Sequence, residues 1–96
     1  MTVLDVDLRG IPLPDLDSLF EALAVPLGLP SWFGRNLHAW NDTIVTGDIS
    51  EVIEAAGFIV LRVDAQGVFG PGVDEGQSFM QICDESGRMK VLRESL

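Results

Sequence analysis

The feature that most constrains the fold of this chain is a nearly continuous apolar run near its middle, Phe58 to Val63. Branched and aromatic residues dominate the run, and such residues favour β-strands. A strand that is apolar at successive positions is typical of the centre of a parallel sheet, where helices cover the faces. The run therefore predicts a central, buried strand whose parallel neighbours are reached through helical connections.

The rest of the sequence supplies two further strands and the helices between them. Val3 to Leu8 alternates valine or leucine with aspartate, as a strand does, and a final strand is expected from Met89 to near Glu94. The helical patterns lie at about Pro14–Ala24, Gly34–Val45, Ile49–Ala56 and Asp74–Ser86. The order β-α-α-(α)-β-α-β predicts an α/β fold, with a three-stranded parallel sheet packed against helices in one domain over residues 1–96.

Local signals mark where the helices start and stop. The candidate capping pairs are Asp48 with Glu51 and Asp74 with Gln77, and the expected terminating glycines are Gly47, Gly57 and Gly87. Residues 65–73 contain three glycines and a proline, which predicts a loop.

Charge and cysteine content restrict the possible partners and the compartment. Fifteen acidic residues against six basic ones give a net charge of −9, which disfavours nucleic acid and suits either a basic protein partner or simple solubility. The single cysteine, Cys83, excludes an internal disulfide and suits a reducing compartment. The N-terminus lacks the pattern of a signal peptide, and no apolar run approaches the roughly 20 residues of a membrane span. We therefore expect a cytoplasmic protein that does not associate with membranes.

The helix expected at 34–45 has two contrasting faces. Leu37, Trp40 and Ile44 share one side and suit a core, with Phe33 at the entry. The other side is a short polar ridge formed by His38, Asn41 and Asp42, which are spaced i, i+3 and i+4. Of the two aromatic residues before the helix, we expect Phe33 to belong to the core and Trp32 to be exposed.

The residues from Leu29 to Asp42 resemble the signature of the barstar family. That signature contains Leu-Pro, an aromatic pair, a glycine, then Asn-Leu-Asp-Ala and a second aspartate four residues after the first. The matching positions are Leu29, Pro30, Trp32, Phe33, Gly34, Asn36, Leu37, Ala39 and Asp42. The resemblance covers residues 1–47 and, mainly in the order of elements, 58–96.

The resemblance implies a cytosolic inhibitor of a small secreted ribonuclease. In the family, the helix after the aromatic pair enters the active site of the enzyme, and one of its carboxylates takes the place of an RNA phosphate; that carboxylate corresponds to Asp42. A glutamate of the last helix that reaches a basic residue of the enzyme corresponds to Glu85. The expected partner contacts are Trp32, Phe33, Arg35, Asn36, His38, Asn41, Asp42, Thr46, Gly47 and Glu85. No catalytic residue, metal or cofactor is expected, and the free protein is expected to be a monomer that binds its target 1:1.

This chain also departs from the family pattern. His38 stands where the family usually has the first aspartate, Asn41 where the best-known member has tryptophan, and Arg35 where that member has an acid. One residue, Val45, is inserted before Thr46-Gly47, and the segment 48–57 is longer. These changes leave the identity of the partner open.

Other interpretations of the same residues remain. Asp42 can be an ordinary solvated helix residue, and its spacing from His38 allows a local ion pair that would account for both. An enzyme would have to use His38, Asp42 and Cys83, but Cys83 falls on an apolar helix face, where a small buried residue is expected. One histidine and one cysteine cannot form a His/Cys metal cluster, and no phosphate-binding loop follows a strand. An immunity protein or regulatory module that binds a partner other than a ribonuclease is the remaining alternative.

Overall fold

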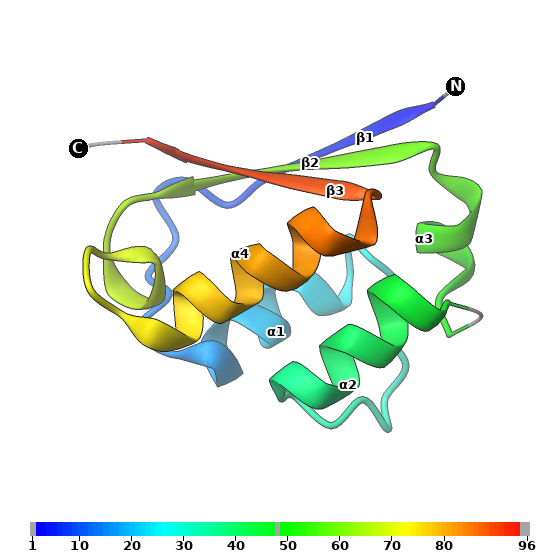
Figure 1. The fold of residues 1–96 in the computed structure, drawn as a ribbon, viewed down its shortest axis with the longest axis horizontal. Helices are drawn as coiled ribbons and strands as arrows, with labels where there is room; N and C mark the ends of the chain where they lie inside the picture. The colour runs from blue at the N-terminus through cyan, green and yellow to red at the C-terminus, as the bar shows by residue number, and fades with distance from the viewer. Residues whose placement is uncertain (1, 48, 95–96) are drawn as a thin grey trace.

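The computed structural model describes residues 2–47 and 49–94. Its strands are β1 (Val3–Asp7), β2 (Phe58–Asp64) and β3 (Met89–Glu94). They form one sheet in the order β1-β2-β3, and both pairs are parallel (Figure 1). The predicted α/β fold with a three-stranded parallel sheet and the apolar run at its centre is confirmed.

The helices gather on one side of this sheet. They are α1 (Leu16–Ala24), α2 (Leu37–Asn41), the π-helix η1 (Asp42–Thr46), α3 (Glu51–Ala55), the 3₁₀ turn η2 (Gly67–Phe69) and α4 (Asp74–Ser86). Figure 1 shows α1, α2 and α4 below the sheet, with α3 at the end of the sheet from which β2 starts. The connections between the parallel strands therefore all return over the same face.

This one-sided arrangement corrects the expectation that the central strand is buried as a whole. Side chains alternate along β2: Ile59, Leu61 and Val63 are buried against the helices, whereas Phe58 and Val60 on the other face are only half-buried. The apolar run looked buried because hydrophobic residues occupy both faces of the strand. Only the face toward the helices belongs to the core.

An aromatic cluster joins the helices to one another. Trp40 of α2 stacks on Phe79 of α4 with ring centroids 5.0 Å apart and planes at 19°, and both side chains are fully buried. Phe20 of α1 contacts Phe33, Trp40 and Phe79 at 5.1–5.9 Å. These contacts fix the position of α2 relative to α1 and α4.

The observed helix ends agree only in part with the capping residues and terminating glycines predicted from the sequence. Gly47 and Gly87 end their helices with φ of 86° and 69°, as predicted, and α1 ends at Ala24. The predicted pair Asp74–Gln77 does not cap α4, because Val73 is the N-cap residue and Asp74 is already helical. Gly57 is not the glycine of a left-handed cap, because Ala56 ends α3 in an extended conformation.

The short third helix starts later than expected. It begins at Glu51, and the side chain of Ser50 caps it by accepting from the Ile53 N–H while donating to the Leu27 carbonyl. Asp48, the residue predicted to cap this helix, lies outside the described residues. Ser50 takes the capping role because its hydroxyl also satisfies a buried carbonyl.

The segment predicted as a loop after β2 contains the 3₁₀ turn η2, in which Val68 and Phe69 are buried. The Val68 N–H donates to the Leu13 carbonyl at 2.8 Å, and the Phe69 ring meets Phe79 edge-on. Gly76 of α4 lies directly over this turn, and a Cβ atom there would collide with the Val68 carbonyl oxygen.

We expect Gly76→Ala to destabilise the protein by about 3 kcal/mol or more, because the methyl group overlaps backbone that cannot move without disturbing η2. Alanine is normally the better helix former, so helix propensity alone predicts the opposite sign. Gly87→Ala is the matched control: it has open space around its Cβ position and loses only about 1–2 kcal/mol from its left-handed φ. Thermal unfolding of both variants tests which of them loses more stability. A Gly76→Ala protein at least as stable as Gly87→Ala would contradict the prediction.

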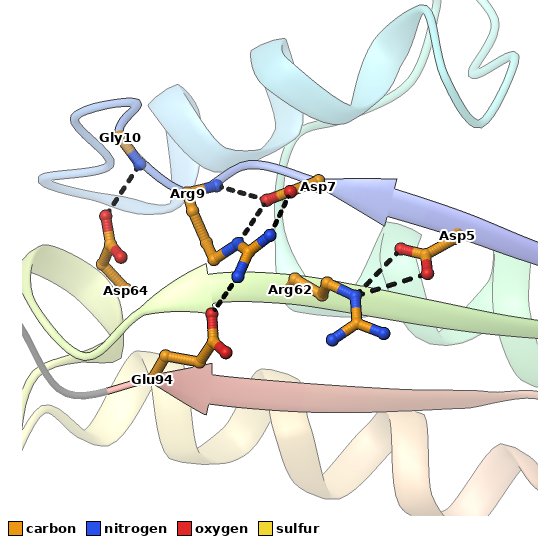
Figure 2. Close-up of polar contacts among 7 residues, drawn as sticks. All are labelled: Asp5, Asp7, Arg9, Gly10, Arg62, Asp64 and Glu94. Atoms are coloured by element: carbon orange, nitrogen blue, oxygen red, sulfur yellow. Dashed lines mark hydrogen bonds and ion pairs between the residues drawn. The ribbon is translucent and has the colours of Figure 1, made fainter.

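The uncovered face of the sheet is held by charge pairs (Figure 2). Arg9 donates to both carboxylate oxygens of Asp7 at 2.6–2.9 Å and to Glu94 at 2.6 Å, so it joins the ends of β1 and β3 across β2. Arg62 pairs with Asp5 at 3.2 Å, and the Gly10 N–H donates to Asp64 at 2.8 Å. The side-chain and backbone hydrogen bonds from Arg9 lower the pKa of the Asp7 carboxyl from 3.8 to about 2.

This lowered pKa predicts a pH dependence of stability. A carboxyl whose pKa falls on folding stabilises the protein above its unfolded pKa and loses that effect as the pH drops through the folded value. The stability difference between the wild type and Arg9→Gln should therefore be full near neutral pH and shrink between about pH 4 and about pH 2. Arg93→Gln is the control. Arg93 donates to the Phe69 carbonyl, which does not titrate, so the stability difference of this variant should not depend on a carboxyl pKa. Urea unfolding across this range measures both differences, and equal pH profiles for the two variants would refute the assignment.

Candidate functional site

The polar ridge is built on a helix whose start is set by Asn36. The Asn36 side-chain oxygen accepts from the Ala39 N–H at 2.8 Å, and its amide donates to the Gly34 carbonyl at 2.9 Å. This is the geometry of an N-cap, so the polar residue of the signature has a structural task. The helix begins at Leu37 rather than at the predicted Gly34.

Arg35 has a strained backbone directly before this cap. Its φ of 49° lies in the left-handed region, which residues with a side chain seldom adopt. Its guanidinium lies 3.3 Å from the carboxylate of Asp17 on α1, and both side chains are largely exposed. No pattern in the sequence predicts this pair, because the two residues are distant in the chain and neither belongs to an apolar pattern.

The second half of the expected helix is a π-helix. From Asp42 the hydrogen bonding widens, and the Gly47 N–H donates to the Asp42 carbonyl, five residues back, at 3.1 Å. A π turn accommodates one more residue than an α turn does. The turn therefore gives a physical account of the inserted Val45, which is exposed, while Thr43 and Ile44 stay buried.

The ridge directs two ionisable side chains into solvent. Asp42 has 48% of its side chain exposed and His38 has 89%, and their nearest atoms, Oδ2 and Nε2, are 3.5 Å apart. Trp40 and Ile44 lie fully buried on the opposite side of the same helical segment. Asn41 is half-buried between the two faces. Asp42 is thus held at the surface by a backbone that is anchored in the core.

The other expected contacts occupy varied environments. Trp32 is 71% exposed, whereas Phe33 is half-buried and meets the Phe20 ring edge-on at 5.1 Å, so the aromatic pair divides as predicted. Thr46 is exposed and Gly47 is buried. Glu85 is exposed on α4, which packs against η1, and it accepts from Gln81 of its own helix at 3.1 Å.

The three residues that an enzyme would need are not assembled. Cys83 is fully buried beside Met89, and burial raises the pKa of its thiol to about 12, so it is a core residue as expected. His38 is almost fully exposed. In residues 2–47 and 49–94, no group of three or more potential metal ligands is found. Within the same residues, no helix has the length and apolar character that crossing a membrane requires.

The sheet has three parallel strands and is covered by helices on one side, and the polar ridge lies on the surface of those helices. These features define a small α/β protein that presents a preformed polar surface. The family model described as Barstar (barnase inhibitor) matches residues 1–93, and the chain belongs to this family. The family consists of inhibitors of barnase-type ribonucleases. A comparison with curated protein sequences gave no match.

The π turn predicts that this segment tolerates the deletion of one residue. Deletion of Val45 should leave a folded protein, because the π turn becomes an α turn. The residues before the deletion then keep the same sides toward the core and toward solvent. Deletion of Ala39, within α2, is the control: it rotates the following residues by about 100° and turns Trp40 and Ile44 out of the core. We expect a cooperative thermal transition for the first variant and its loss for the second. Unfolding of both to the same degree would contradict this account of the insertion.

Proposed function

We propose that this protein inhibits a small secreted ribonuclease of the barnase type by covering its active site with α2, η1 and the loop before them. Asp42 takes the position of an RNA phosphate, and Trp32, Asn36, His38, Thr46 and Glu85 contribute to the surrounding contact. The complex is 1:1, the free inhibitor is a monomer, and it acts in the cytoplasm of the cell that makes the enzyme.

The observation that carries this proposal is the exposed carboxylate of Asp42 on an anchored helix. A ribonuclease active site gathers basic side chains around a phosphate, and a carboxylate that enters it forms charge-assisted hydrogen bonds. The fully buried Trp40 and Ile44 on the opposite face order this segment before binding. Order that exists in the free protein does not have to be generated on association, which favours affinity.

The charge of the whole chain supports the same partner. A net charge of −9 attracts a basic enzyme over long distances and accelerates the encounter. Salt screens this attraction, so the association rate should fall as ionic strength rises.

The test is a titration of a barnase-type ribonuclease with the purified protein, read as loss of RNA cleavage. We expect Asp42→Ala to weaken inhibition by at least about 2 kcal/mol, roughly thirtyfold, because removal of the carboxylate leaves the enzyme's phosphate site unpaired. Glu75→Ala removes the same charge from an exposed site in the first turn of α4, outside the proposed contact, and serves as the control. Undiminished inhibition by Asp42→Ala would exclude the role given to this residue.

A second candidate is an immunity or regulatory protein of the same fold that acts on a partner other than a ribonuclease. Arg35 and His38 favour it: His38 places an imidazole where the family usually has an aspartate, and Arg35 places a guanidinium where the best-known member has an acid. The same titration separates the two: binding of a different secreted toxin, without inhibition of ribonucleases, would support the second candidate.

A further inference from the structure

We propose that His38 makes the inhibitor sensitive to pH: protonation of its ring pairs it with Asp42 and weakens binding of the ribonuclease. This inference rests on the proposed function, because it concerns the same carboxylate. It adds a regulatory role to the contact proposed for His38 at the binding surface.

The geometry places the two groups within reach of each other on the free protein. His38 Nε2 lies 3.5 Å from Asp42 Oδ2, across one turn from α2 into η1. The imidazole is 89% exposed, so little packing restricts its orientation, and the two atoms already lie within ion-pair distance. The carboxylate, at 48% exposed, is available both to the ring and to a partner.

The charge on the ring decides which of these two interactions Asp42 makes. A neutral imidazole leaves the His38–Asp42 pair with one negative charge, which a cationic active site attracts. Protonation brings the pair to zero net charge and engages the carboxylate locally. The partner's basic groups would then face an imidazolium, which repels them. Histidine is the side chain whose charge changes between pH 5 and 8, so binding should weaken as the pH falls through this range.

The other charged groups around the ridge do not replace Asp42 as the partner of His38. In the loop before α2, Arg35 pairs with Asp17 of α1 at 3.3 Å, and Glu21 is a further exposed acid of α1. Helix α4, which packs against α2 and η1, carries Asp74, Glu75, Asp84 and Glu85. Among the described residues, Asp42 is the only carboxylate within 4.0 Å of an imidazole nitrogen of His38.

The experiment compares the wild type with His38→Gln against the same barnase-type ribonuclease at about pH 5.5 and about pH 7.5, on the two sides of histidine titration. Glutamine keeps a polar side chain of similar reach but carries no charge at either pH. The dissociation constant of the wild type should rise on acidification by about two- to fivefold more than that of His38→Gln, a range suited to an exposed pair screened by solvent. Because the enzyme is the same in both series, its own titration cancels in the ratio.

Asp42→Asn provides a matched control for the mechanism. Without the carboxylate, His38→Gln should no longer change the ratio of the two dissociation constants. In the free protein, the carboxyl ¹³C resonance of Asp42 should follow protonation of the ring in the wild type and lose that response in His38→Gln.

The outcomes are distinct. Binding with equal pH ratios in the wild type and His38→Gln would overturn this inference and leave the proposed function standing. A dissociation constant that rises less on acidification in the wild type than in His38→Gln would also overturn it, because the protonated ring would then favour the complex. Absence of binding and inhibition at both pH values would overturn the proposed function and, with it, this inference.

Discussion

The stacking of Trp40 on Phe79 is the contact on which the candidate site depends. It joins the short α2 to the long α4, which itself packs against η1 and β3, and Phe20 of α1 adds a second ring contact to Trp40. A helix of five residues has little stability of its own. The exposed residues on α2 and η1 therefore owe their fixed positions to the buried residues on the opposite face.

The sheet separates the protein into two sides with different tasks. The covered side holds the core and, beyond it, the helices that carry His38 and Asp42. Within residues 2–47 and 49–94, no helix covers the other side, and the charge pairs around Arg9 and Arg62 join its strands instead. Acidic residues thus serve two purposes in this chain: some pair with arginines within the fold, and Asp42 stays available on the surface.

The sequence predicted the features that rest on repeating patterns. The parallel sheet, the apolar faces of α1 and α4 and the opposite faces of the helix around Trp40 all follow from hydrophobic spacing. Features that depend on contacts outside the local pattern were missed, such as the Arg35–Asp17 pair, the close approach of Gly76 to Val68 and the hydrogen bond from Ser50 to the Leu27 carbonyl. The burial of β2 was overestimated, since hydrophobicity at successive positions does not reveal whether helices cover one face or both.

The π turn is a further case in which local pattern was informative but incomplete. The sequence indicated an extra residue at Val45, yet only the structure shows that the backbone absorbs it by widening one turn after Asp42. Trp40 and Ile44 keep their buried positions as a result.

The two tryptophans of the chain occupy opposite environments, Trp32 being 71% exposed and Trp40 fully enclosed. A quencher dissolved in the buffer reaches the first indole and not the second. The fluorescence of this protein therefore contains two separable signals, one from the loop at the candidate interface and one from the interior.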